Sequence, residues 1–297
     1  MKAAVCLAIF AWVGISGCST GTTSAEIPAP SPGLELSTER YSTARARFRT
    51  HLIREGPATP DRIKLPEIAD AVEVAYPSGN HSLRAYASPP EPAGRAKPGL
   101  LFLHGGFVFG EGHWAMTRPF REAGYVVMMP TLRGENGQPG NFSLFYDEVA
   151  DVLAASDSLA ARPDVDSKHL YLAGHSVGGT LAMLTALESS RFRGAASFSG
   201  SPDQREYTRG RPERVPFDPT NGDEFRLRSP VVFATGFRCP LRLYFGEEEY
   251  WLLNATRRTA LLADRAGLDV EAVEVAGGHE TANPEVIQKC IEFFRSL

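Results

Sequence analysis

The chain has 297 residues, of which 22% are charged and 43% hydrophobic, with a formal net charge of −4. A slightly acidic chain lacks the basic surface that nucleic-acid-binding proteins need, so we expect no nucleic-acid partner. The seven histidines are scattered and none lies in an H-E-x-x-H motif. We therefore expect neither a metal site nor a cofactor.

A targeting segment opens the chain. Residues 3–15 form an uncharged, mostly apolar run, too short for the about 20 helical residues that span a bilayer and of the length of a signal-peptide core. The run ends in Ile15-Ser16-Gly17-Cys18, which resembles the bacterial lipobox. The resemblance implies a lipoprotein signal peptide over 1–17 and a lipidated Cys18, at the outer membrane or the periplasmic face of the cell envelope. The alternative is an ordinary secretory peptide and a secreted protein.

Residues 18–66 are expected to connect this segment to the main domain. Residues 19–37 are rich in Ser, Thr, Gly, Pro and Ala, a composition typical of a flexible tether. A helix is predicted over 38–55, with Phe48, Leu52 and Ile53 docking it on the domain that follows. Residues 67–297 are enough for one domain with a large core. Whether Cys239 and Cys290 pair within it stays open, because the sequence does not give their separation.

The main domain alternates strand and helix patterns. We expect strands at 72–76, 83–87, 100–104, 125–130, 169–173, 194–198, 241–245 and 270–275. Helices are predicted at 114–123, 144–161, 181–187, 251–266 and 284–296. A polar stretch, 201–236, interrupts the alternation and is expected to form an insertion over the active site. This order predicts an α/β fold, a mostly parallel sheet with helices on both faces that binds ligands at the carboxyl ends of its strands.

Residues 169–187 carry the first chemical signal. An apolar strand pattern ends in Gly174-His175-Ser176-Val177-Gly178, a G-x-S-x-G match, and a helix pattern follows at once. Small neighbours let such a turn close, and the helix N-terminus directs N–H groups at an anion beside the serine. The pattern predicts that Ser176 is a nucleophile.

A serine hydroxyl needs a base within hydrogen-bond reach and an acid that orients the base. After Ser176 the chain contains one histidine, His279, directly behind the expected strand 270–275. The strand 241–245 ends in Gly246 and three successive glutamates, residues 247–249. We expect Glu249 to orient His279, with Glu248 as the alternative acid and Glu247 as a solvated charge.

The loop after strand 100–104 reads His104-Gly105-Gly106-Phe107. A tetrahedral intermediate needs preorganised N–H donors, so we expect one from Val177 and one from Gly106 or Phe107. His104 is expected to brace this loop, and the His175 side chain to point away from the serine hydroxyl. Phe107, Phe109 and Trp114 are candidates for an apolar wall beside the acyl group.

These segments, with Leu132-Arg133-Gly134 and Arg228-Ser229-Pro230, resemble the α/β-hydrolases. Within that superfamily the chain is similar to the prolyl oligopeptidase (S9) catalytic domain and to the dienelactone hydrolases. The resemblance implies the α/β-hydrolase fold and the order serine, acid, histidine. Two departures from the family pattern are expected to matter: the acid is a glutamate, and the chain has no room for the β-propeller of true prolyl oligopeptidases. Dienelactone hydrolases also use a cysteine nucleophile, where this chain has a serine.

The sequence therefore predicts a serine hydrolase with a small ester or a short peptide as substrate. An S9 peptidase-like activity is our first hypothesis, and a carboxylesterase or acyl esterase of the same fold is the alternative. A lipid-anchored binding module without catalysis is the alternative from another class. It would be marked by loss of Ser176 or His279, and both are present.

Overall fold

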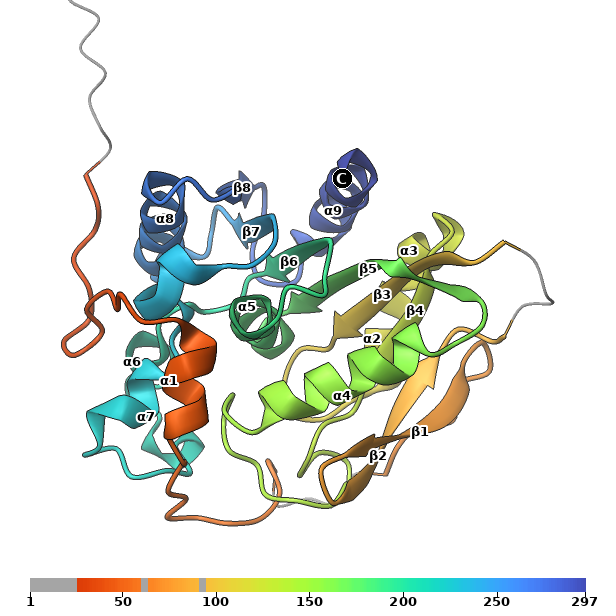
Figure 1. Ribbon diagram of the computed structural model, residues 1–297, viewed down its shortest axis with the longest axis horizontal. Coiled ribbons are helices and arrows are strands. Elements are labelled where there is room, and N and C mark those ends of the chain that lie inside the picture. The colour runs from red at the N-terminus through yellow and green to blue at the C-terminus, as the bar shows by residue number, and fades with distance from the viewer. Residues whose placement is uncertain (1–25, 60–63, 91–94) are drawn as a thin grey trace, which may run out of the picture.

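The computed structural model describes residues 26–59, 64–90 and 95–297, and the predicted signal peptide and Cys18 lie outside these ranges. A sheet of eight strands, ordered β1-β2-β4-β3-β5-β6-β7-β8, forms its centre (Figure 1). The strands are β1 (Val72–Ser78), β2 (His81–Ala87), β3 (Lys97–Leu103), β4 (Val126–Pro130), β5 (Val165–His175), β6 (Gly194–Phe198), β7 (Leu241–Gly246) and β8 (Val270–Val275). The β1–β2 hairpin is antiparallel and pairs antiparallel with β4, whereas β3 to β8 run parallel. The predicted α/β fold with a mostly parallel sheet is confirmed.

Helices cover both faces of the sheet (Figure 1). The longer helices are α4 (Glu148–Ala160), α5 (Val177–Glu188), α8 (Tyr250–Arg265) and α9 (Asn283–Ser296), and the short ones α1 (Tyr41–Arg47), α2 (Glu111–Met116) and α3 (Arg118–Glu122). Successive residues of β3 point to opposite faces, so Leu101 and Leu103 pack in the core under α4 and α5, while Leu100 and Phe102 pack under α2, α3 and α9. Two apolar layers therefore hold the strands, as a buried parallel sheet requires.

Two helices differ from the prediction: one begins later than expected, and the other is divided into two. The helix predicted from residue 144 begins only at Glu148, because Leu144 and Phe145 have φ of 54° and 72°, outside the helical region. The helix predicted over 114–123 is split at Thr117 into α2 and α3. Both differences lie in the loops that follow β4 and β3, at the end of the sheet that carries the site.

The predicted helix over 38–55 is mostly wrong. Only α1 is helical, and the chain then extends, so that Leu52 forms an isolated antiparallel bridge with Phe217. Phe48 packs against the core as expected, but Ile53 is 60% exposed and docks on nothing that would bury it. Bonds to the 201–236 stretch, rather than helix packing, hold residues 51–54.

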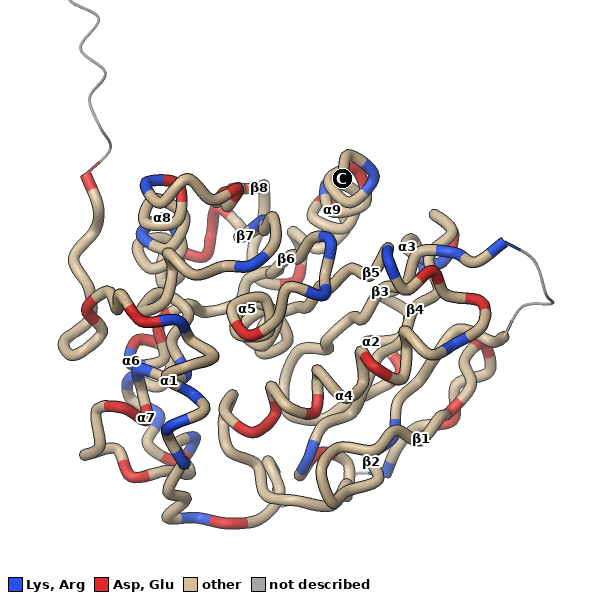
Figure 2. Tube along the Cα trace, in the orientation of Figure 1, with Lys and Arg blue, Asp and Glu red and all other residues tan. Residues whose placement is uncertain are grey.

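Residues 201–236 fold into short helical turns, α6 (Gln204–Tyr207), η1 (Pro212–Arg214), α7 (Gly222–Arg226) and η2 (Pro230–Gly236). Their charges are mixed in sign along the chain (Figure 2). Arg228 and Glu224 are both fully buried and form an ion pair of 2.5 Å. Arg228 also donates to the carbonyl of Ser143 and to Thr50, and its guanidinium lies 4.0 Å from the Phe217 ring centroid. This one side chain thus joins the stretch to the N-terminal segment and to the loop before α4.

Cys239 and Cys290 are free thiols, Cys290 fully buried. Across the part of the chain that the structure describes, no helix has the length and hydropathy to cross a membrane.

Candidate active site

Ser176 lies on a strained turn between β5 and α5. Its φ of 54° and ψ of −115° fall in a region that side chains rarely adopt, and its N–H donates to the Phe198 carbonyl at 2.7 Å. A Cβ added at Gly178 would lie 2.2 Å from the Leu103 carbonyl oxygen, so only glycine fits where α5 crosses the end of β3. The turn presents the Ser176 hydroxyl at the carboxyl end of the sheet.

A hydrogen-bond chain runs from Ser176 through His279 to Glu249. Ser176 Oγ lies 2.9 Å from His279 Nε2, and His279 Nδ1 lies 2.6 Å from Glu249 Oε1. His279 comes from the loop after β8 and Glu249 from the turn after β7. Glu248, the alternative acid, is exposed, as is Glu247. The structure therefore brings together the serine, the histidine and the third of the three glutamates.

Three donors surround the Glu249 carboxylate. Oε2 accepts from Ser199 Oγ at 2.5 Å and from the N–H of Gly246 at 2.7 Å, while Oε1 accepts from His279. Burial raises the pKa of Glu249, but the hydrogen bonds from His279, Ser199 and Gly246 outweigh burial and the net shift is downward. The hydrogen bond to Glu249 raises the pKa of His279 above 6.5, against an opposing effect of burial. Glu249 is thus held ionised and stabilises a proton on the imidazole.

The loop after β3 approaches the nucleophile at Gly105. A Cβ added there would lie 2.8 Å from His175 Nδ1 and 3.5 Å from Ser176 Cβ. Gly106 follows with φ of +68°, and the Phe107 ring packs on Phe142 with centroids 4.9 Å apart. On the other side of Ser176, Val177 is the first residue of α5, so its N–H has no carbonyl one turn earlier to bond.

The predicted apolar wall is wrong for two of its three residues. Phe109 and Trp114 are each 1% exposed and belong to the core under α2 and α3. The aromatic side chain beside the site is Trp251, which is 45% exposed with its ring centroid 6.3 Å from that of His279. The periodicity at the start of α8 gave no signal that Trp251 would lie there.

Residues 100–281 match the alpha/beta hydrolase family. The chain belongs to this family. The uncharacterized peptidase YtmA of Bacillus subtilis (strain 168) is 28% identical over 183 residues, which are 55% of this chain and 66% of that relative. The chain spans 66%, 26% and 56% of the three curated relatives it matches, two of which are named as uncharacterized peptidases and one as a putative esterase.

Solved structures share the fold of this chain. An acylaminoacyl peptidase of Pyrococcus horikoshii superposes with a TM-score of 0.62 at 20% identity, over 76% of this chain and 40% of its own. The esterase Est2 of Thermogutta terrifontis gives a TM-score of 0.61 at 22% identity, over 78% of this chain and 94% of its own. A dienelactone hydrolase structure from Klebsiella pneumoniae also matches, at 18% identity and a TM-score of 0.58. At these identities the likeness concerns the fold.

The site contains supporting side chains that the sequence interpretation missed. His175 Nε2 lies 3.0 Å from the His279 carbonyl oxygen, so it donates to the backbone of that loop, and burial lowers the pKa of His175. Ser199, itself at φ of 54°, holds Glu249. A small polar residue directly after strand β6 was the available signal for Ser199. Nothing in the sequence pattern relates His175 to the backbone of His279.

One group of potential metal ligands lies in the described part of the chain. Ligand atoms of His175, His279 and Glu280 all lie within 4.8 Å of one another. His175 Nε2 and both ring nitrogens of His279 already make hydrogen bonds within the site. An ion there would compete with the bond from His279 to Ser176, so the geometry suits proton transfer better than metal binding.

Proposed function

We propose that this protein is a serine hydrolase that cleaves ester or amide bonds with Ser176, His279 and Glu249 as its catalytic residues. The supporting observation is the unbroken hydrogen-bond chain of 2.9 and 2.6 Å that joins the three side chains. A serine, a histidine and a buried carboxylate in this order of contact are the arrangement that activates a hydroxyl.

In the proposed reaction Ser176 Oγ attacks the substrate carbonyl carbon while His279 Nε2 accepts the hydroxyl proton. The carbonyl oxygen becomes an oxyanion that accepts from the N–H of Val177 and from that of Gly106 or Phe107. His279 then gives its proton to the leaving oxygen or nitrogen, the carbon–heteroatom bond breaks, and an acyl ester on Ser176 remains. Water, deprotonated by His279, hydrolyses that ester in the reverse sequence of steps.

Small esters and short peptides are the proposed substrates. An S9 peptidase-like activity is supported by the peptidase name of the relative YtmA and by the fold shared with an acylaminoacyl peptidase. A carboxylesterase activity is the second candidate, because the esterase Est2 matches over nearly its full length. Both reactions use the same site and differ in the leaving group that His279 protonates.

We also propose that lipid on Cys18 anchors the enzyme at the outer membrane or the periplasmic face of the cell envelope. The Ile15-Ser16-Gly17-Cys18 sequence supports this proposal. Growth with radiolabelled palmitate should label the full chain and leave Cys18→Ala unlabelled. Equal labelling of both chains would refute the anchor.

The proposed activity is tested by active-site labelling. A fluorophosphonate probe should label the full-length protein, and the labelling should be lost in Ser176→Ala and in His279→Ala. Glu248→Gln, an exposed neighbour of the acid, should label at the wild-type rate. Unlabelled protein is then assayed with short-chain esters and with short peptide amides. Folded wild-type protein that takes no label would refute the hydrolase proposal and favour the binding module.

A further inference from the structure

The loop that carries the proposed oxyanion donors, residues 104–109, is held between two parts of the chain. On one side it contacts the nucleophile turn, where the N–H of Gly178 donates to the His104 carbonyl at 3.1 Å. On the other side it faces the segment 132–142, which follows β4. Both ends of the loop are fixed from that segment by two consecutive side chains, Glu135 and Asn136.

Glu135 fixes the first residue of the loop. Its Oε2 lies 3.1 Å from His104 Nε2 and also accepts from the N–H of Leu132 at 2.8 Å. His104 Nδ1 lies 2.9 Å from the Gly105 carbonyl oxygen. Since a carboxylate and a carbonyl both accept, the two ring nitrogens must both donate, which requires a protonated imidazole.

Electrostatics agree with this protonation state. Burial lowers the pKa of His104, but the charge of Glu135 and the two hydrogen bonds outweigh it, so the pKa is raised. The nearest other ring, His113, lies 5.1 Å away between centroids, and its pKa is lowered to about 4, chiefly by burial and then by the charge of His104. His104 and Glu135 are both nearly fully buried, so removing one partner would leave an unpaired buried charge.

Asn136 fixes the last residue of the loop. Its Oδ1 accepts from the N–H of Phe109 at 2.8 Å and its Nδ2 donates to the carbonyl of Phe109 at 3.0 Å. These two hydrogen bonds, one accepted and one donated by the same side-chain amide, fix both the position and the orientation of the Phe109 backbone. Asn136 itself has φ of 43°, a conformation that asparagine tolerates better than most side chains.

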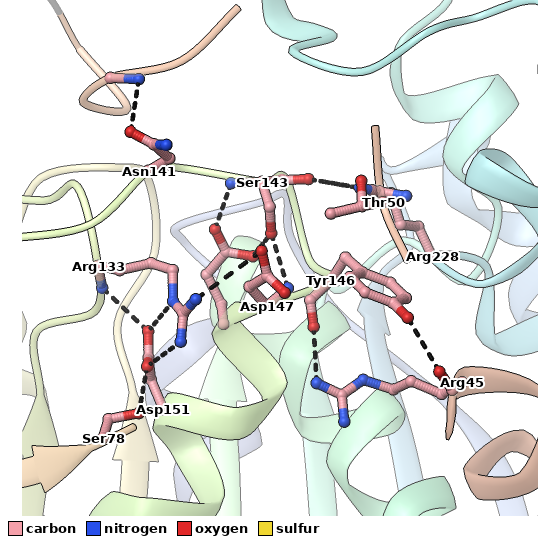
Figure 3. A network of polar contacts seen from close by, with 12 residues as sticks. Arg45, Thr50, Ser78, Arg133, Asn141, Ser143, Tyr146, Asp147, Asp151 and Arg228 are labelled. Atoms are coloured by element: carbon pink, nitrogen blue, oxygen red, sulfur yellow. Dashed lines mark hydrogen bonds and ion pairs between the residues drawn. The ribbon is translucent and has the colours of Figure 1, made fainter. Parts of the chain in front are cut away.

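The clamping segment is anchored away from the site. Figure 3 shows Arg133 meeting both oxygens of the buried Asp151, at 2.8 and 2.7 Å, with Ser78 Oγ bonded to the same carboxylate. The loop beyond is held by Ser143, whose N–H and hydroxyl both donate to the buried Glu148 at 2.6 Å. The segment that carries Glu135 and Asn136 is therefore fixed to α4 and β1, and these two side chains in turn fix the loop beside Ser176.

We propose that Glu135 and Asn136 are positioning residues for the oxyanion hole, and that they act by fixing the two ends of the loop 104–109. The proposal rests on the hydrolase function proposed above. Their loss displaces the loop N–H groups from the place where the carbonyl oxygen becomes negative. Since that interaction grows as charge develops, kcat should fall while KM stays close to its wild-type value.

The first test compares Asn136→Ala with Gln138→Ala. Gln138 is an amide in the same segment, but its Oε1 accepts from the N–H of Arg84 in β2, so it is a matched control. We expect Asn136→Ala to lower kcat roughly 10- to 100-fold, a fraction of the loss caused by deleting an oxyanion donor. Asn136→Asp keeps the acceptor for the Phe109 N–H and should recover part of the rate. Gln138→Ala should keep the wild-type kcat.

The second readout separates an oxyanion effect from general damage. Sulfur accepts hydrogen bonds weakly, so the thionoester analogue of a good ester substrate gains little from the oxyanion donors. Both Asn136→Ala and Glu135→Gln should lower kcat/KM for the ester much more than for the thionoester. Thermal unfolding of each variant verifies that the loss occurs in folded protein.

The outcomes distinguish the two proposals. If the wild-type chain neither takes the fluorophosphonate label nor turns over any ester or amide, both the proposed hydrolase function and this inference are refuted. If wild type is active but both variants keep its kcat, or lose ester and thionoester activity equally, the positioning role alone is refuted.

Discussion

Replacing Glu249 with glutamine should abolish activity without unfolding the protein, and the contacts of the carboxylate give the reason. Three donors, on His279, Ser199 and Gly246, point at an acceptor-only group. Glutamine keeps one oxygen and presents an NH₂ in place of the other. That NH₂ must face either the Gly246 N–H or the His279 ring.

We expect the glutamine amide to adopt the orientation with the lower free energy. Facing Gly246, the NH₂ would leave a buried backbone donor unpaired, at a cost of about 1–3 kcal/mol. Facing His279, it can donate to Nδ1, because the imidazole can move its proton to Nε2. We therefore expect the amide oxygen to stay on Gly246 and Ser199. The Nε2 proton then points at Ser176 Oγ, so the ring no longer accepts the hydroxyl proton.

The expected loss is about 10⁴-fold in kcat, the size seen when a catalytic histidine is held in the wrong tautomer. The free energy of unfolding should change by less than about 1 kcal/mol, since the donors on Ser199 and Gly246 keep an acceptor. Steady-state ester hydrolysis and urea unfolding measure the two quantities, with Glu248→Gln as the matched control. A Glu249→Gln variant within tenfold of wild-type kcat, or a Glu248→Gln variant as inactive, would contradict the assignment of the acid.

Three further predictions concern the base, the buried ion pair and the rim of the site. The hydrogen bond to Glu249 raises the pKa of His279, and only the neutral ring is a base. The value of kcat/KM should therefore fall on acidification with a midpoint above pH 6.5, and a midpoint below 6.5 would contradict this effect of Glu249 on His279. Arg228→Met removes the cation that pairs with the buried Glu224 and leaves that carboxylate with the hydrogen bonds from Thr50 and the His51 N–H. Urea unfolding should therefore show a loss of about 3–5 kcal/mol in the free energy of unfolding, partly recovered by adding Glu224→Gln. Trp251→Ala should raise KM for esters with aromatic leaving groups about 2- to 10-fold and leave ethyl esters unchanged; an equal effect on both would exclude a ring-specific contact.

Local patterns predicted most of the fold. Each strand from β3 to β7 contains a short apolar run, and β8 contains Val and Ala interspersed with Glu; these signals depend only on neighbouring residues. The candidate site follows from the same patterns, because parallel strands bring their carboxyl ends to one edge. Residues as far apart in sequence as Ser176 and His279 could therefore be expected at one place before any contact was known.

Other features depend on contacts that no local pattern records. The helix predicted from residue 144 loses its first turn because Ser143 bonds Glu148 and, through its carbonyl, the buried Arg228. The helix predicted over 38–55 is extended beyond α1 because residues 51–54 bond to the 201–236 stretch, including the backbone of Pro216. In both places the backbone gains partners from distant segments that a continued helix would not reach.

For the site, the sequence by itself predicted the serine, the histidine and Glu249, with Glu248 as the alternative acid. Only the tertiary structure gives the contacts of the two side chains, since the turn after β7 buries Glu249 against Ser199 and leaves Glu248 in solvent. The same holds for the side chains proposed to fix the loop 104–109. Glu135 and Asn136 have no periodicity or motif. Their proposed role depends on contacts with the His104 side chain and the Phe109 backbone, 31 and 27 residues earlier, which only packing of the whole sheet brings within bonding distance.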